Sequence, residues 1–250
     1  MNQVFPAALV GSLIGTFVGG LTKFLWERLL PDWITWRRTL RMERDRHLAA
    51  IRAPAYLAFS ELQGRLRIIA HKQAKTYKNP KKLGADEFYV RSTAYLLSRA
   101  FAWQVVLREH MASYDYAELY KCLQDFTKAL TRGKSSGFQI FKLEQHEIGE
   151  RMLTRISAED TSCLLFSEFV DRITGQEPQR WIESITKRTI ALLENPYEEL
   201  DRLQKIDEAL TQILKLIDPD DRFQYPSKFL PEPIDANKIR TRLERLSRVS

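Results

Sequence analysis

The chain has 250 residues, of which 44% are hydrophobic, and it carries a formal net charge of +7 at pH 7. This length suits an anchor plus one domain of about 200 residues, and the hydrophobic content is ample for a core. The two cysteines, Cys122 and Cys163, are too few for a disulfide framework and form no Cys-x-x-Cys motif. We expect both to be reduced core thiols in a reducing compartment, with a single disulfide between them as the alternative.

The N-terminal part of the sequence is uncharged and apolar. Residues 1–22 contain no charged side chain, and residues 4–21 are apolar apart from Ser12, Thr16 and several glycines. Because a helix needs about 20 apolar residues to cross a bilayer core, we expect a transmembrane anchor at residues 1–31. A cleaved signal peptide would carry its positive charges before the apolar run, whereas here they follow it. A buried core helix is the remaining alternative.

Basic and tryptophan side chains follow the apolar run and predict how it is oriented. Basic residues concentrate on the cytoplasmic side of membrane helices. We therefore expect a single-pass protein of the inner or plasma membrane, with its N-terminus outside and its main domain cytoplasmic. Tryptophan prefers the headgroup level because its ring is apolar and its N–H needs a partner. The predicted membrane-interface residues are Lys23, Trp26, Arg28, Trp33, Trp36, Arg37, Arg38 and Arg41.

Three glycines at intervals of four residues share one face of the predicted anchor helix. Gly11, Gly15 and Gly19 form two overlapping small-xxx-small motifs, which allow a second helix to approach closely. We expect this face to mediate helix association, either with a second copy of the chain or with another protein. The alternative is that these residues only reflect the high frequency of glycine in membrane helices.

The positive charge of the chain is concentrated next to the predicted anchor. Residues 23–82 contain 15 Lys and Arg against 5 Asp and Glu, whereas the rest of the chain is slightly acidic. We expect residues 32–82 to form a basic juxtamembrane helical segment that is interrupted at Pro54 and ends in a lysine-rich loop. Anionic lipid headgroups are the expected partner of this region. Nucleic acid is the less favoured alternative.

Apolar periodicity predicts a helical bundle for residues 83–217, and no segment shows a sustained strand pattern, so the fold class is all-α. The broad apolar face of residues 86–111 predicts a central helix with neighbours on several sides. Residues 197–217 place apolar side chains at the 3-4 spacing of bundle packing. The other predicted helices are residues 116–130, residues 138–156, a helix after Ser157 that buries Leu165, Phe166, Phe169 and Ile173 and ends at Gly175, and a helix that begins near Pro178.

Residues 218–250 are predicted to be a proline-rich linker followed by a basic helix at residues 236–249. Ile239, Leu243 and Leu246 fall on one face of that helix. The sequence leaves open whether this face docks on the bundle, on the membrane or on a partner.

One acidic cluster is the strongest candidate for chemistry. Glu144, Glu147 and Glu150 are spaced by three residues on one predicted helix, with His146 between them. Helical di-iron sites use carboxylates at such spacings, but they also need a Glu-x-x-His motif, which this sequence lacks. We therefore assign no catalytic, cofactor-binding or metal-binding residues and expect no cofactor. Gly149 in the same helix marks either a tight helix crossing or a tolerated glycine.

The leading functional hypothesis is a membrane-anchored scaffold, adaptor or regulatory subunit that acts through protein–protein and membrane-surface contacts. It follows from an anchor joined to a well-filled core without a catalytic motif. One alternative is a membrane-tethered hydrolase or metal-dependent enzyme that uses Glu144, Glu147 and Glu150. The second alternative is a nucleic-acid binder that uses the basic residues 23–82.

Overall fold

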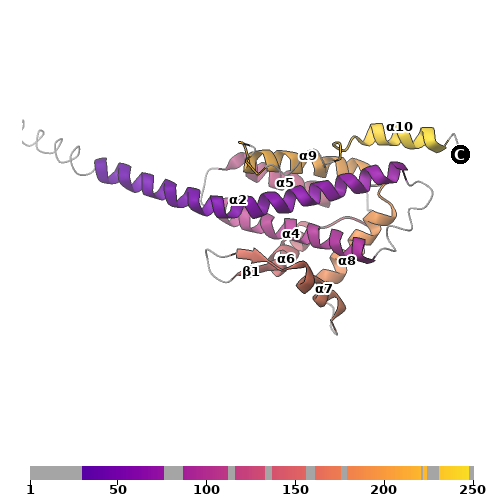
Figure 1. The fold of residues 1–250 in the computed structure, drawn as a ribbon, viewed down its shortest axis with the longest axis horizontal. Coiled ribbons are helices and arrows are strands. Elements are labelled where there is room, and N and C mark those ends of the chain that lie inside the picture. Colours follow the sequence, from indigo (N-terminus) through magenta and orange to yellow (C-terminus); the bar gives the residue numbers. More distant parts are fainter. Residues whose placement is uncertain are drawn as a thin grey trace, which may run out of the picture. The chain divides into compact units, whose positions relative to one another are not determined.

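The computed structural model describes residues 30–75, 87–111, 116–132, 137–155, 161–175, 179–220, 222–223 and 231–247. The chain divides into two compact units, residues 1–50 and residues 51–250. The described residues form eight helices and one two-stranded sheet, so the prediction of a mostly helical fold is confirmed (Figure 1). Among them, no helix is both long enough and apolar enough to cross a membrane.

Figure 1 colours the elements by their order along the chain. The strands are β1 (Leu153–Arg155) and β2 (Thr161–Cys163). The helices are α2 (Leu30–Lys75), α4 (Glu87–Met111), α5 (Ala117–Thr131), α6 (Lys142–Met152), α7 (Phe166–Thr174), α8 (Arg180–Glu194), α9 (Leu200–Ile217) and α10 (Ala236–Ser247). Because α2 contributes to both compact units, the packing described below concerns residues 51–250 alone.

The predicted anchor lies outside the described residues except for its last two positions, and so do Gly11, Gly15 and Gly19. Among the predicted membrane-interface residues, the first three, Lys23, Trp26 and Arg28, also lie outside them. The other five belong to α2, and the structure describes their backbone but not their side chains: Trp33, Trp36, Arg37, Arg38 and Arg41. Contact of these residues with lipid therefore stays a prediction.

Helix α2 runs without interruption from Leu30 to Lys75, so the expected break at Pro54 is wrong. Proline removes one helical hydrogen bond, and the carbonyl left without that bond belongs to Ala50, an exposed residue whose oxygen water can reach. In the turns that follow Pro54, Ala58 and Phe59 are fully buried. Solvation of the freed carbonyl and packing of these side chains together keep the helix continuous.

Helix α4 is the central helix of the bundle, as its broad apolar face predicted. It contacts α5, α6, α7 and α8, and its side chains Leu97, Phe101 and Trp103 are at most 4% exposed. The approach of α6 is close because Gly149 has no side chain. A Cβ atom at that position would lie 2.6 Å from the carbonyl oxygen of Phe101. Of the two alternatives for Gly149, the tight helix crossing is confirmed.

Helices α5 and α9 pack against each other on another side of α4. The apolar positions of α9 with the 3-4 spacing are all buried, namely Leu203, Ile206, Leu210, Ile213 and Ile217. On α5, the residues Leu123, Phe126 and Leu130 are fully buried. The predicted role of the α9 pattern in bundle packing is therefore confirmed.

A short β-hairpin follows α6, which the search for a sustained strand pattern did not indicate. The predicted helix at residues 138–156 is correspondingly shorter and spans Lys142–Met152. Strands of three residues are too short for an alternating apolar pattern to become visible in the sequence. The strands β1 and β2 are antiparallel, and the opposing residues are Leu153 and Cys163, Thr154 and Ser162, and Arg155 and Thr161.

The C-terminal segment docks on the bundle, an outcome that the sequence had left open. Helix α10 packs on α9, and Ile234, Ile239 and Leu243 are at most 5% exposed. The carboxylate of Asp207 on α9 accepts a hydrogen bond from the backbone N–H of Ile234 at 3.0 Å. Ile239 and Leu243 of the predicted apolar face are thus covered by the bundle, and the side chain of Leu246 lies outside the described residues.

Candidate functional site

Glu144, the first residue of the acidic cluster, stabilises the start of α6. Its carboxylate accepts a hydrogen bond from the backbone N–H of Phe141 at 3.2 Å, which caps the helix. The other carboxylate oxygen accepts a hydrogen bond from Ser184 Oγ on α8 and lies 4.0 Å from Arg188 Nε. Glu144 is therefore bonded through both oxygens and joins α6 to α8.

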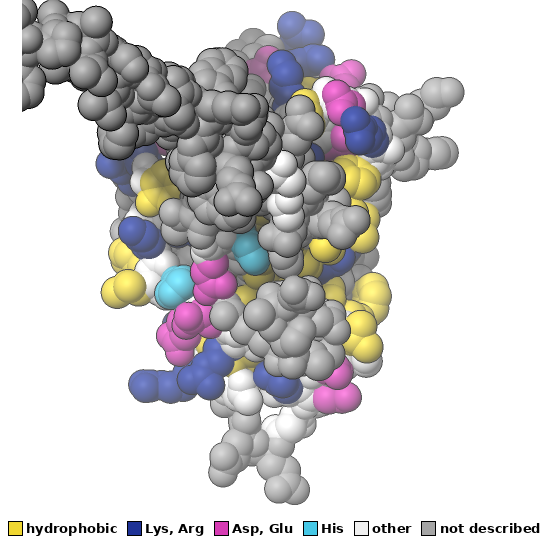
Figure 2. All heavy atoms as spheres, turned by 90° about the vertical axis from the view of Figure 1, so that its left-hand side faces the viewer, with side chains coloured by type: hydrophobic (Ala, Val, Ile, Leu, Met, Phe, Trp, Pro, Cys, Tyr) yellow, Lys and Arg dark blue, Asp and Glu magenta, His cyan; other side chains and the backbone are white. Residues whose placement is uncertain are grey.

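The other two members of the cluster, Glu147 and Glu150, are exposed. Glu150 pairs with His146, whose Nε2 atom lies 3.4 Å from the carboxylate. Figure 2 shows histidine and acidic side chains side by side on the surface that faces left in Figure 1. Within the described ranges, no group of three or more His, Cys, Asp or Glu side chains is placed to hold a metal ion. The three glutamates therefore do not form a metal cluster there.

Both cysteines are free thiols, as predicted, and each is half-buried. Burial raises the pKa of Cys163 to about 11, although the nearby Arg99 opposes the change. Burial also raises the pKa of Cys122, and the carboxylate of Asp125 adds to the effect. Because the thiolate is the reactive form, both residues are poor nucleophiles at neutral pH.

In folded protein carrying Cys122→Ser, Cys163 is expected to react with iodoacetamide at neutral pH at least about tenfold more slowly than in the denatured chain. Raising the pKa from 9.0 to about 11 leaves about one hundredth of the thiolate. The greater basicity of that thiolate recovers only part of the rate, and burial limits access further. The rate should increase with pH up to about 11. Mass spectrometry measures the alkylated fraction, and equal rates in the folded and denatured chains would contradict the prediction.

A buried polar bridge joins α5 to both α4 and α6, and the sequence patterns did not indicate it. Thr127 Oγ1 on α5 accepts hydrogen bonds from Gln104 at 2.6 Å and from Arg108 at 2.7 Å, both on α4. Gln145 on α6 donates to the Ile140 carbonyl oxygen at 2.9 Å and to that of Thr127 at 3.3 Å. Burial lowers the pKa of Arg108. These groups bond to one another, so we assign them a structural role. Glutamines within apolar helices are the sequence signal that could have found the bridge.

An exposed aromatic patch lies where α4 meets the start of α7. We define it by Phe88 and Tyr95 of α4 and by Leu165 and Phe166 of the β2–α7 junction. Phe88 is 67% exposed and Leu165 is 64% exposed. The Phe166 ring packs edge-on against Phe88 and Tyr95, with centroid distances of 5.8 and 5.4 Å. The patch is continuous with the core, because Tyr95 also contacts the buried Phe169 ring at 5.5 Å.

The predicted burial of Leu165 is wrong, and the sequence analysis missed Phe88. The expected helix after Ser157 would place Leu165 on the same face as Phe169, but α7 begins only at Phe166. Leu165 therefore precedes the helix in extended backbone and its side chain lies in solvent. The unbroken apolar run at residues 163–166 exceeds what one helix face can bury, and it is the signal that could have indicated the patch.

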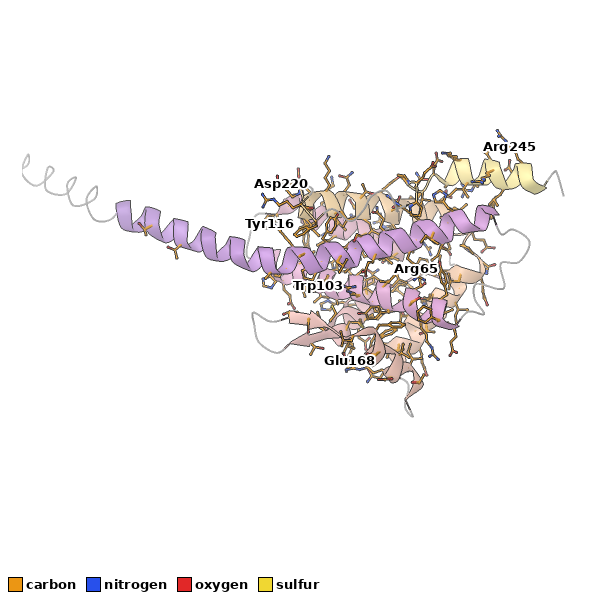
Figure 3. The ribbon with its side chains drawn as sticks, in the orientation of Figure 1. Arg65, Trp103, Tyr116, Glu168, Asp220 and Arg245 are labelled. Carbon is orange, nitrogen blue, oxygen red and sulfur yellow. The ribbon has the colours of Figure 1, made fainter. Side chains whose placement is uncertain are left out.

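Charged side chains flank the aromatic patch on two sides. Arg65 of α2 donates hydrogen bonds to Ser92 Oγ and Thr93 Oγ1 of α4, each at 3.2 Å. On the α7 side, Glu168 accepts a hydrogen bond from the backbone N–H of Leu165 at 2.8 Å. Figure 3 shows the labelled residues Arg65 and Glu168 with α4 between them. The patch thus has an apolar centre with Arg65 on one side and Glu168 on the other.

A second surface feature is a groove of about 960 Å³ between α5 and α9. Its lining includes the small residues Ala129 and Ala209, which are at most 9% exposed, and the buried ion pair of Arg202 with Glu199 at 2.9 Å. The other charged lining residues carry both signs, namely Asp125, Lys128, Arg132, Glu198, Asp201, Lys205 and Glu208. Such mixed charge selects no single class of ligand, so we assign none to the groove.

No known protein family, curated protein or solved structure matches this chain. The functional argument therefore rests on the geometry of the described residues. Their fold is a helical bundle, and its best candidate for a functional site is the aromatic patch, where large apolar side chains lie in solvent between two charged residues.

Proposed function

We propose that the chain is a scaffold, adaptor or regulatory subunit whose helical bundle, tethered to a membrane, binds another protein molecule. The observation that carries this proposal is the aromatic patch, in which Phe88 is 67% exposed and Leu165 is 64% exposed. The tether at residues 1–31 and the cytoplasmic position of the bundle come from the sequence. If an alkaline wash releases the full chain from membranes, the membrane tether is refuted. The proposed binding of a protein at the aromatic patch then stands without it.

Burial of the aromatic patch would provide the binding free energy. Exposed apolar clusters on folded proteins mark interaction surfaces, and aromatic side chains are enriched among the residues that dominate binding. The rings of Phe166 and Tyr95 pack on each other, and the Tyr95 ring also packs on the buried Phe169. They therefore lose little conformational entropy when a partner covers them, which favours tight association.

Two of the residues that the alternative functions would use, Glu144 and Arg67, are engaged in the fold. Glu144 caps α6 and bonds to Ser184, so its carboxylate is held away from substrate chemistry. In the basic region, Arg67 is buried in an ion pair with Asp207 at 2.7 Å, where it cannot reach a phosphate. These observations support protein binding over a hydrolase centred on Glu144 or a nucleic-acid surface that includes Arg67.

Crosslinking in cells, followed by pull-down of the full chain, tests the proposed function. Wild-type protein should recover a binding partner, and the double variant Phe88→Ala/Leu165→Ala should recover it with an affinity at least about tenfold weaker. Leu143→Ala is the matched control, because Leu143 is 81% exposed and lies on α6, outside the patch. Equal recovery by the wild type, the control and the double variant would refute the role of the patch.

A further inference from the structure

We propose that a second copy of the chain covers the aromatic patch in a two-fold symmetric dimer, in which Arg65 of each copy pairs with Glu168 of the other. This inference rests on the proposed binding function and names the occupant of its site. It is motivated by the arrangement of the patch, which has a cation on its α2 side, an anion on its α7 side and exposed apolar side chains between them.

Arg65 supplies the cation. Its guanidinium is half-buried, donates to the neutral hydroxyls of Ser92 and Thr93, and lies 4.3 Å above the Tyr89 ring. No carboxylate in the described part of the chain forms an ion pair with it. A partly desolvated guanidinium with neutral partners gains strongly from a carboxylate, which it can bind through two parallel hydrogen bonds.

The neighbouring arginines each have a carboxylate partner, which Arg65 lacks among the described residues. Arg91 pairs with Glu87, and Arg99 pairs with Glu61 at 2.7 Å. Both of these pairs lie within this copy of the chain, on α4 or between α2 and α4. Arg65 therefore retains capacity for an acidic group from outside, whereas Arg91 and Arg99 do not.

Glu168 supplies the anion. One of its oxygens accepts a hydrogen bond from the backbone N–H of Leu165, and the side chain is exposed in the first turn of α7. Within the described residues no Lys or Arg forms an ion pair with this carboxylate, including Arg172 one turn further along the helix. A carboxylate accepts several hydrogen bonds, so Glu168 can cap α7 and still bind a guanidinium.

Helix geometry places the apolar centre between the two charges. Ser92, which contacts Arg65, follows Phe88 by four residues and therefore lies on the same face of α4. The Phe88 ring contacts Phe166, the first residue of α7, and Glu168 lies in that same helical turn. The order across the surface is thus cation, aromatic side chains and anion.

A surface with this order is complementary to itself. In a two-fold dimer the same patch meets its own copy in the opposite direction, so that residue i contacts residue j and residue j contacts residue i. The apolar side chains of both copies then meet at the centre, and two Arg65–Glu168 pairs form at the edges. Charge balance favours this occupant over an anionic lipid surface. Among the described residues, Arg91 and Arg99 are already paired with Glu87 and Glu61, and the charge of Arg65 is matched by that of Glu168 on the other side of the patch.

Charge reversal in the full chain tests the pairing. Wild type, Arg65→Glu and Glu168→Arg are purified in mild detergent, and their dimer dissociation constants are measured by sedimentation. Each single variant should dimerise at least about tenfold more weakly, because two like-charge contacts replace two ion pairs. A mixture of the two variants should form a heterodimer of wild-type affinity, because both contacts again join opposite charges.

Two further variants distinguish the effect of the Glu168 charge on dimerisation from an effect on folding. Glu168→Gln keeps a side chain that can cap α7 but removes the charge, so it should weaken the dimer, while the thermal unfolding temperature, measured at a concentration where both proteins are monomeric, changes little. Glu183→Arg reverses an exposed acidic residue in the first turn of α8 and should leave the dimer intact. Weakening by Glu183→Arg equal to that by Glu168→Arg would overturn the specific pairing.

The possible results distinguish this inference from the proposed function. A monomeric wild type overturns the dimer, and the proposed function survives only if Phe88→Ala/Leu165→Ala still loses a different partner in cells. A dimer that withstands every patch variant also overturns the inference and assigns self-association to another surface, such as the helix face of Gly11, Gly15 and Gly19. Weak homodimers of the single variants together with a restored heterodimer support the inference.

Discussion

Replacement of Asp207 by alanine is expected to lower the free energy of unfolding by about 3–5 kcal/mol. Asp207 is 3% exposed, and its Oδ1 atom accepts a hydrogen bond from Arg67 Nε at 2.7 Å. Its Oδ2 atom accepts a hydrogen bond from the backbone N–H of Ile234 at 3.0 Å. The alanine variant leaves a buried guanidinium without its counter-ion and a buried N–H without an acceptor, and both are strongly destabilising.

Equilibrium unfolding in denaturant measures this loss, and Asp201→Ala is the matched control. Asp201 also lies on α9 and also bonds to the C-terminal segment, through Arg240 at 2.7 Å, but its side chain is 65% exposed. An exposed pair contributes at most about 1 kcal/mol, so the control should remain close to wild type. Hydrogen exchange should in addition show loss of protection in α10 for Asp207→Ala. Similar unfolding free energies for the two variants would refute the central role of Asp207.

Replacement of Gly149 by alanine is expected to lower the free energy of unfolding by about 1–3 kcal/mol, although alanine is the better helix former. In an open helix the substitution would add about 1 kcal/mol of stability. Here the new Cβ would lie 2.6 Å from the Phe101 carbonyl oxygen and 2.8 Å from Val105 Cγ2. A valine side chain can rotate, but the backbone of α4 cannot move without separating α4 from α6. The cost of the steric clash therefore exceeds the gain in helix propensity.

Gly175→Ala provides the comparison for this substitution. Gly175 follows the last turn of α7, and a Cβ there would lie 3.3 Å from the Asp171 carbonyl oxygen. We expect a change within about 0.5 kcal/mol, as is usual for surface positions. Thermal and denaturant unfolding measure both variants. A Gly149→Ala protein as stable as wild type would show that the crossing of α4 and α6 can open without loss.

Local patterns in the sequence were sufficient to predict the main helices. The 3-4 spacing from Leu203 to Ile217 identified the buried face of α9, and the broad apolar face around Phe101 identified the central position of α4. These predictions succeeded because burial of an apolar stripe depends on spacing along one helix, which the chain itself specifies. For the glycine in the middle of α6 the sequence offered two alternatives, a tight helix crossing or a tolerated glycine, and only the structure selected the crossing.

Other features escaped prediction because their causes lie between segments that are distant in sequence. Leu165 matches a buried position of the helix expected after Ser157, but the hairpin occupies the preceding residues and α7 begins only at Phe166, which leaves the Leu165 side chain in solvent. The hairpin itself consists of strands of three residues, which carry no recognisable period. Pro54 was expected to interrupt α2, but packing of the following turns keeps the helix intact.

The sequence by itself determined the helical class, the buried faces of the long helices and the concentration of positive charge in residues 23–82, because each depends on the order of residue types. Only the tertiary structure decided where the C-terminal segment docks and which residues form the candidate site. Asp207 meets Ile234, and Arg65 and Glu168 come to lie on opposite sides of the aromatic patch, through packing of helices that are far apart along the chain. No local pattern encodes such contacts, because they arise from the simultaneous burial of several helix faces against one another.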